Sequence, residues 1–226
     1  MKNYSIAIDG PAGAGKSTIA KLIAKKLGYI YIDTGAMYRA MGLYLSQNKI
    51  SLSDDEQIAW ACENVDISIT FENEVQQVIL NGENVNGLIR TPEASLMASN
   101  CSALQPIREK LVELQQKLAS TTSVVMDGRD IGTKVLPDAD LKIYLTASTF
   151  VRAKRRFDEM VAQGQDCNLA EIESAIVDRD YRDMNRKHSP LRQADDAILL
   201  DSSDMSIDEV VNRVIQMFME KKSMQS

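Results

Sequence analysis

One glycine-rich segment near the amino terminus, Gly10-Pro-Ala-Gly-Ala-Gly-Lys-Ser-Thr18, constrains the fold more than any other part of the chain. It matches G-x-x-x-x-G-K-[ST], the pattern of the phosphate-binding P-loop. Residues 4–9 before it are mostly apolar, which indicates a strand. Residues 17–27 after it carry apolar side chains at helical spacing and end at Gly28, which indicates a helix. Because a P-loop lies between a strand and a helix, this context supports the motif and predicts an α/β fold.

The P-loop residues form a predicted phosphate cradle. Glycines allow successive backbone N–H groups to converge on phosphate oxygens, and the following helix adds the positive end of its dipole. Lys16 is expected to reach the β- and γ-phosphates, and the Ser17 hydroxyl to hold Mg²⁺. We therefore predict binding of a nucleoside triphosphate; the competing interpretation is a glycine-rich turn that only joins strand to helix. The predicted cradle comprises Gly10, Pro11, Ala12, Gly13, Ala14, Gly15, Lys16, Ser17 and Thr18.

Strand and helix signals alternate along most of the chain. Further strands are expected at 29–33, 123–127, 141–145 and 197–201, and helices at 36–47, 54–64, 92–103, 106–120, 149–163, 169–187 and from Ser206 onward. Five short apolar strands interleaved with helices predict an open, mostly parallel sheet with helices on both faces. Residues 65–90 differ, because 66–71 and 77–80 have strand character and Asn81-Gly82 is a turn signal; they predict a small antiparallel insert. Ser53 is the expected N-cap of the helix at 54–64.

Composition excludes several classes of function. The chain has 226 residues, which suits one domain, and its 44% hydrophobic and 26% charged residues are typical of a globular protein. A net charge of −6 and 5% aromatic residues argue against a nucleic-acid-binding surface. A single histidine, His188, excludes a His-rich metal site. No apolar stretch suits a membrane span or a signal peptide, and three widely spaced cysteines favour a reducing cytoplasm.

Charged residues gather at three places where an acceptor substrate can bind. One cluster, 33–39, begins at the end of the second predicted strand, and another, 127–130, ends the third. In open parallel sheets ligands bind beyond the carboxyl ends of the strands, so both clusters are expected near the P-loop. The third, 179–186, places cations and acids three or four residues apart on one helix face. The alternatives are weak surface ion pairs on that helix, and ordinary turn acids or ligands of Mg²⁺-bound water at Asp33 and Asp127.

The ordered set of motifs resembles the bacterial cytidylate kinases, a branch of the P-loop nucleoside monophosphate kinases. The similarity covers nearly the whole chain and rests on GPAGAGKST, IDTGAMYRA, IRT, the stretch from Ser99 to Glu109, MDGRDIGT, RDYRDMNR with Ser189-Pro190-Leu191 after it, and ADDAILLDSS. The antiparallel insert also stands where that family carries a small extra sheet. A guanine-reading N-K-x-D motif is missing from the sequence, which argues against a GTPase.

The resemblance implies roles for individual side chains. Arg39 and Arg129 would hold the acceptor phosphate, because guanidinium groups match phosphate oxygens in pairs. Asp183 and Arg179 would contact the ribose. The residues implied to recognise cytosine are Thr34, Ser99, Arg108, Asp130 and Arg186. Arg152 and Arg156 would close over the triphosphate as lid arginines, the alternative being a solvated basic helix face. The implied catalytic residues are Lys16, Arg39, Arg129 and Arg179.

The resemblance also implies an organisation and a reaction. The whole chain, 1–226, would be one P-loop kinase domain of three layers, with a five-stranded parallel sheet and the antiparallel insert. The core would cover about 1–35, 121–150 and 195–226, the monophosphate-binding region about 36–120, and the lid about 151–190. A cytoplasmic monomer would transfer the γ-phosphoryl group of ATP-Mg²⁺ to CMP or dCMP in pyrimidine metabolism, without nucleic acid or membrane partners.

Two alternatives to this reaction stay open at the level of sequence. One is a P-loop kinase for another acceptor, such as UMP, AMP or a small molecule that is not a nucleotide. The other belongs to a different class, a P-loop protein that senses nucleotide or RNA without transferring phosphate. The low aromatic content and the acidic net charge argue against RNA as its ligand.

Overall fold

The computed structural model of the protein describes residues 2–72 and 75–224. The chain forms two compact units, of which the first comprises Met1–Tyr31 with Ser123–Ser226 and the second comprises Ile32–Thr122. Throughout the described ranges, every helix is too short or too polar to span a bilayer.

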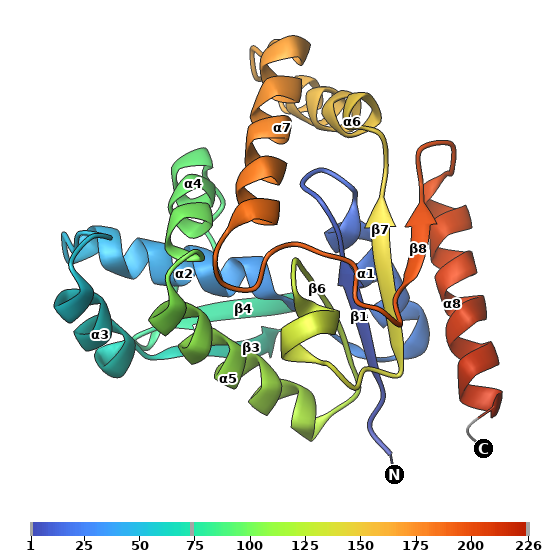
Figure 1. Ribbon diagram of the computed structural model, residues 1–226, viewed down its shortest axis with the longest axis horizontal. Coiled ribbons are helices and arrows are strands. Elements are labelled where there is room, and N and C mark those ends of the chain that lie inside the picture. The colour runs from blue at the N-terminus through green and yellow to red at the C-terminus, as the bar shows by residue number, and fades with distance from the viewer. Residues whose placement is uncertain (1, 73–74, 225–226) are drawn as a thin grey trace. The chain divides into compact units, whose positions relative to one another are not determined.

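The predicted five-stranded parallel sheet is confirmed (Figure 1). Its strands are β1 (Ser5–Asp9), β2 (Ile30–Asp33), β6 (Val124–Gly128), β7 (Leu141–Thr146) and β8 (Ile198–Asp201). The order across the sheet is β2-β6-β1-β7-β8. β1 pairs in parallel with both β6 and β7, and β7 pairs in parallel with β8. The P-loop therefore follows the central strand, at the carboxyl edge where open parallel sheets bind their ligands.

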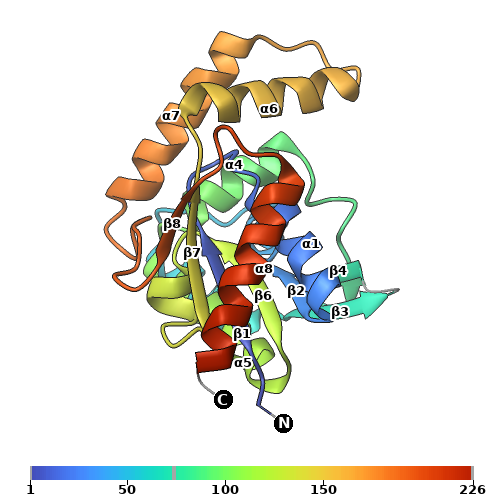
Figure 2. The same ribbon diagram turned by 90° about the vertical axis from the view of Figure 1, so that its right-hand side faces the viewer.

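Apolar side chains on two helices cover this sheet in the first unit. Ile6 and Ile8 of β1 are fully buried and share a core cluster with Ile23 of α1 and Val214 of α8. Figure 2 shows α8 lying along this face in front of β1 and β7. Two further helices, α6 and α7, pack against each other. The helices of the first unit are α1 (Lys16–Leu27), α6 (Thr149–Ala162), α7 (Leu169–Asn185) and α8 (Ile207–Met224).

A short π-helix, η1 (Ile131–Val135), follows β6 and was not predicted. Five residues are too few to show a periodic apolar pattern, so no local signal announces this element. Its beginning is held by a distant side chain, because the Asp9 carboxylate accepts hydrogen bonds from the backbone N–H groups of Ile131 (2.8 Å) and Gly132 (2.7 Å).

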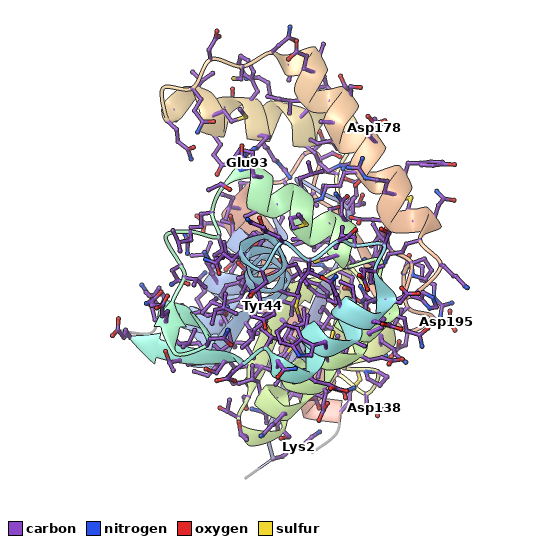
Figure 3. All side chains as sticks on the ribbon, turned by 90° about the vertical axis from the view of Figure 1, so that its left-hand side faces the viewer. Lys2, Tyr44, Glu93, Asp138, Asp178 and Asp195 are labelled. Atoms are coloured by element: carbon purple, nitrogen blue, oxygen red, sulfur yellow. The ribbon has the colours of Figure 1, made fainter. Side chains whose placement is uncertain are left out.

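The second unit contains the predicted antiparallel insert. β3 pairs with β4 and β4 pairs with β5, both antiparallel, to give a three-stranded sheet. Asn81 (φ 49°) and Gly82 (φ 86°) make the turn between β4 and β5, as their positive φ angles allow. Tyr44 of α2 lies in the packed interior of this unit, 6% exposed (Figure 3). The elements are α2 (Thr34–Gln47), α3 (Asp55–Asn64), β3 (Ile67–Glu72), β4 (Val75–Leu80), β5 (Glu83–Asn84), α4 (Pro92–Cys101) and α5 (Gln105–Thr121).

Two helix beginnings in this unit differ from the predictions. Asp54 rather than Ser53 caps α3, with its carboxylate accepting from the N–H of Gln57 at 3.0 Å. Helix α2 begins at Thr34, two residues earlier than expected, because the Asp33 carboxylate accepts from the N–H of Ala36 at 2.9 Å. In both cases an acidic side chain supplies an acceptor for an N–H group that has no partner within the helix.

Truncating Phe218, which lies in an aromatic cluster in the core of the first unit, tests how much that cluster contributes to stability. Phe218 is 1% exposed, and its ring meets those of Tyr4 and Tyr29 edge-on, at centroid distances of 5.8 and 5.9 Å. Phe218→Ala should lower the free energy of unfolding by about 3–5 kcal/mol through lost burial and a new cavity. The neighbouring Met219 is 48% exposed, so Met219→Ala should change it by less than about 0.5 kcal/mol. Urea unfolding of both variants measures these free energies, and an equal loss of stability in the two variants would contradict the prediction.

Candidate active site

The P-loop connects β1 to α1 and depends on glycine at two positions. Gly10 has φ 150°, and a Cβ atom there would lie 2.0 Å from the carbonyl oxygen of Leu145. Gly15 has φ 84° and is the residue immediately before α1. Any side chain at Gly10 would collide with the neighbouring strand, and Gly15 requires a left-handed backbone that other residues adopt poorly. These constraints explain both glycines without reference to a ligand.

Lys16 is buried in the cradle, at 5% exposure, and its Nζ donates to the carbonyl oxygen of Pro11 at 2.7 Å. Burial lowers its pKa well below the ordinary value, and the nearby positive charges of Arg129 and Arg179 lower it further. Asp127 and Asp183 act in the opposite direction, but they do not compensate. A phosphate group in the cradle would supply the missing negative charge, so the electrostatics of Lys16 suit an anionic ligand.

Asp127 at the end of β6 accepts two hydrogen bonds from hydroxyl groups. Ser17 Oγ donates to Asp127 Oδ2 and Tyr31 Oη donates to Asp127 Oδ1, each at 2.8 Å. Carboxylate and hydroxyl oxygens are ligands that suit Mg²⁺, which often binds proteins through one or two such groups and completes its shell with phosphates and water. The described part of the chain contains no cluster of three His, Cys, Asp or Glu side chains for a metal ion.

A buried ion pair also clamps the P-loop. Arg152 Nη1 donates to the carbonyl oxygen of Ala12 (2.7 Å) and to Asp180 Oδ2 (2.6 Å), while Asp180 Oδ1 accepts from the N–H of Ala12 (2.9 Å). Both sides of one P-loop residue are thereby held by side chains from α6 and α7. Arg152, predicted as a lid arginine, is 5% exposed here, whereas Arg156 is exposed and pairs with Glu159 at 2.8 Å.

Helix α7 and the end of β6 bring together five of the residues predicted to bind the acceptor. Arg129 Nε donates to Asp183 Oδ2 at 2.8 Å, and Arg186 Nη2 lies 3.8 Å from Asp130 Oδ1. Burial by itself would raise the pKa of Asp183, but Arg129, Arg179 and Arg186 outweigh it and hold that pKa below the ordinary value. Asp183 is therefore ionised at neutral pH and orients the Arg129 guanidinium.

The remaining residues predicted to bind the acceptor substrate belong to the second unit. Arg39 Nη2 donates to Asp33 Oδ2 at 3.0 Å, which sets the guanidinium close to the first turn of α2. Arg108 of α5 is buried, donates to the carbonyl oxygen of Ser102 at 3.0 Å and lies over the ring of Tyr38. The other two predicted residues are Thr34, buried in the first turn of α2, and Ser99, half-buried on α4.

Three acidic or polar residues of these sites escaped the sequence analysis. Asp9 holds η1, Asp180 holds the P-loop, and Gln76 of the insert contacts the backbone of Asp33. Only Asp9 carried a signal, since it ends a predicted strand at the ligand-binding edge of the sheet. Asp180 resembled one more charge on an Arg- and Asp-rich helix, and Gln76 stood in a strand whose partner was unknown.

Two solved structures share this fold. A gluconokinase from Sinorhizobium meliloti 1021 gives a TM-score of 0.51 at 18% identity, over 99% of this chain and 97% of that chain. An uncharacterized protein from Eubacterium ventriosum gives a TM-score of 0.53 at 14% identity, over 97% of this chain and 99% of that chain. At these identities the likeness concerns the fold alone. Together with the P-loop at the end of the central strand, the fold defines the class as P-loop α/β proteins.

Closer relatives define the family. The sequence profile of the family described as cytidylate kinase matches residues 6–220. A cytidylate kinase from Caldicellulosiruptor saccharolyticus is 52% identical over 218 residues, which is 96% of each chain. One from Lactobacillus johnsonii is 50% identical over 222 residues, covering 97% of this chain and 96% of that one. The chain belongs to the cytidylate kinase family, so the resemblance found in its motifs is confirmed. The roles of individual residues stay predictions.

The buried Asp9 carboxyl should make stability depend on pH. Burial raises its pKa from 3.8 to about 6, against the two backbone N–H groups that favour the ionised form. The pKa of Asp9 is higher in the folded state than in the unfolded state. The stability that the protonated Asp9 carboxyl contributes is therefore fully present below about pH 4 and is lost as the pH rises through about 6. Relative to Asp9→Asn, the wild-type free energy of unfolding should fall by about 2–3 kcal/mol across that window. Urea unfolding of both proteins measures this difference, and a constant difference would contradict it.

Proposed function

We propose that the protein transfers the γ-phosphoryl group of ATP to CMP or dCMP, giving ADP and CDP or dCDP. The observation that carries the proposal is membership of the cytidylate kinase family, with 52% identity to a relative of that name over 96% of both chains. The arrangement around Lys16 supports it, because a buried lysine flanked by Arg129 and Arg179 suits a reaction between highly charged phosphates.

The ATP side of the reaction uses the P-loop. Backbone N–H groups of the loop hold phosphate oxygens, and Lys16 Nζ exchanges the carbonyl of Pro11 for the β- and γ-phosphates. A Mg²⁺ ion bound together with ATP would supply charge neutralisation at these phosphates. It would be held by the Ser17 hydroxyl and, through water, by Asp127, which are already 2.8 Å apart.

The acceptor side uses arginines that carboxylates orient. Arg129 is held through Nε by Asp183, which leaves guanidinium N–H groups for the acceptor phosphate, and Arg39 is held through Nη2 by Asp33. Planar guanidinium groups bind phosphate oxygens in pairs, and a fixed orientation lowers the entropy lost on binding. Asp183 and Arg179 contact the ribose in this proposal.

Cytosine recognition is assigned to groups of complementary hydrogen-bonding type. The exocyclic amino group of cytosine donates, and the acceptors proposed for it are Asp130 and the Ser99 hydroxyl. Ring N3 and the carbonyl O2 accept, and the proposed donors are Arg108 and Arg186. Thr34 on α2 is also proposed to reach the base. Uracil presents a carbonyl where cytosine presents the amino group, so a carboxylate at that point would reject it.

Catalysis then consists of positioning and charge neutralisation. An oxygen of the acceptor phosphate attacks the γ-phosphorus as the bond from that phosphorus to the β,γ-bridging oxygen breaks, and ADP leaves. The attacking oxygen is already anionic, so the site needs no strong general base. Lys16, Arg129, Arg39 and Arg179 stabilise the charge that is spread over the transferred group.

The lid and the setting of the reaction belong to the same proposal. Residues 151–190 would act as the lid, 36–120 as the monophosphate-binding region and the rest as the core. Arg156, whose ion pair with Glu159 is exposed, would turn toward the nucleotide, while Arg152 would first exchange its bonds to Ala12 or Asp180. Closure would exclude water and limit ATP hydrolysis. We place the reaction in pyrimidine metabolism and expect a monomer. Three free cysteines support a cytoplasmic setting.

Two substitutions should separate the ATP side from the acceptor side. Lys16→Ala should abolish phosphoryl transfer. Arg129→Ala should raise KM for CMP by about two orders of magnitude, since a charge-assisted contact to phosphate is lost. If Arg129 contacts the acceptor phosphate, the dissociation constant of Arg129→Ala for ATP-Mg²⁺, measured by calorimetry, should stay within about twofold of the wild-type value. Equal weakening of ATP and CMP binding by Arg129→Ala would contradict this assignment.

Substrate choice tests the proposed reaction directly. A coupled assay of ADP release, with ATP-Mg²⁺ against CMP, dCMP, UMP, AMP, GMP and dTMP, should show rapid turnover with CMP and dCMP only. Asp130→Ala should reduce the preference for CMP over UMP by about tenfold or more, as expected when one base-reading contact is removed. Faster turnover with UMP or AMP would keep the kinase fold but overturn the proposed acceptor. A wild-type protein without turnover on any monophosphate would favour a nucleotide-sensing protein.

A further inference from the structure

A glutamine of the antiparallel insert binds the backbone of a residue at the end of β2. Gln76 lies on β4, and its Oε1 accepts from the N–H of Asp33 at 2.8 Å. Its Nε2 donates to the carbonyl oxygen of the same residue at 3.4 Å. The side-chain amide therefore pairs with Asp33 as a peptide group of a neighbouring strand would. Forty-three positions separate the two residues along the chain, so the contact is purely tertiary.

The position of Asp33 explains why its backbone needs such a partner. β2 is an edge strand of the five-stranded sheet, and the N–H of Ile30 points toward β6, donating to the carbonyl of Ser123. Because successive residues of a strand direct their N–H groups to opposite sides, the N–H of Asp33 points to the open edge. Without Gln76 the N–H and carbonyl groups of Asp33 would lose this partner at the open edge of β2, and the backbone would be held less firmly where the chain turns into α2.

The Asp33 carboxylate in turn organises the residues that follow it. Oδ1 accepts from the N–H of Ala36 and caps α2, and Oδ2 accepts from Arg39 Nη2 at 3.0 Å. The guanidinium keeps unused donor capacity, because within the described residues its buried Nε has no hydrogen-bond partner. Two hydrogen-bonded contacts thus connect β4 of the insert to Arg39. The first joins the Gln76 side chain to the backbone of Asp33, and the second joins the Asp33 carboxylate to Arg39.

The geometry points to Gln76 as a positioning residue for the acceptor phosphate, acting on Arg39 through Asp33. This inference rests on the proposed function, in which Arg39 holds the phosphate of CMP. It gives the insert a task in the reaction: both outer strands pair with β4, and Gln76 on β4 fixes the start of α2. A shift of the Asp33 backbone moves its carboxylate, and the Arg39 guanidinium moves with it.

The insert is itself braced at this position. The carbonyl oxygen of Gln76 accepts from Asn86 Nδ2 at 3.0 Å, and Asn86 Oδ1 accepts from the N–H of Val78 at the same distance. Gln76 also pairs across the sheet with Phe71 of β3. The side chain that reaches Asp33 therefore extends from a backbone that is held on both sides, as a positioning residue requires.

The test is a steady-state comparison of Gln76→Met with Gln77→Met. Methionine keeps the length of the side chain and removes both amide groups. Gln77 is the matched control, because its side chain bonds inside the insert, accepting from Asn84 and Asn86 at 2.9 and 2.7 Å. Gln76→Met should raise KM for CMP about three- to tenfold, the effect of losing a neutral hydrogen bond, with KM for ATP unchanged. Gln77→Met should leave both values near those of the wild type.

A double-mutant cycle with Arg39→Ala separates positioning from general loosening of the insert. If Gln76 acts through Arg39, Gln76→Met should have no further effect on KM for CMP in the Arg39→Ala background. Full additivity in that background, an unchanged KM for CMP, or equal effects on CMP and ATP would each overturn the inference. Gln76→Ala serves as the second variant if the methionine variant folds poorly. The wild type is assayed first, since absence of CMP turnover there overturns the proposed function instead.

Discussion

Burial of charge at the carboxyl ends of β1 and β6 is the constraint on which the site of the first unit depends. Burial disfavours the protonated form of Lys16, the nearby charges of Arg129 and Arg179 disfavour it further, and Asp127 and Asp183 only partly balance these effects. An isolated charge in such a place is strongly unfavourable, so every member needs a partner in a fixed geometry. The excess of positive charge is what a polyphosphate would neutralise, and the same excess keeps the carboxylate of Asp183 ionised.

Carboxylates hold the loops of both units by one recurring contact. Asp9 accepts from the N–H groups that begin η1, Asp180 accepts from Ala12 in the P-loop, and Asp33 accepts from Ala36 at the start of α2. Backbone N–H groups at helix beginnings and in loops lack ladder partners, so they need acceptors from elsewhere. The acids that look like surface charges in the sequence are thereby used to set the backbone around ligand-binding positions.

Much of the fold and part of the site could be predicted, because their signals are local. Each of these signals lies within one short segment of the chain: the helical spacing from Ser17 to Leu27, the P-loop pattern, and the apolar run of each strand. The structure contains the helix and all five strands. The misses have non-local causes. η1, which was not predicted, is held by Asp9 across more than a hundred residues. The burial of Arg152 by an ion pair with α7 also depends on a distant residue, and its role as a lid arginine stays a prediction. Competition between Ser53 and Asp54 for one helix end was decided by side-chain geometry.

By itself the sequence determined the order of the elements, the P-loop between β1 and α1, and the kinase family, since each depends on residues that are neighbours in the chain. Tertiary structure alone decided which charged and polar groups meet. The pairs Arg129 with Asp183, Arg152 with Asp180 and Gln76 with Asp33 join segments 28 to 54 residues apart. Their formation depends on strand order, helix packing and the direction of an edge N–H group, and no pattern of spacing along the chain encodes those distances.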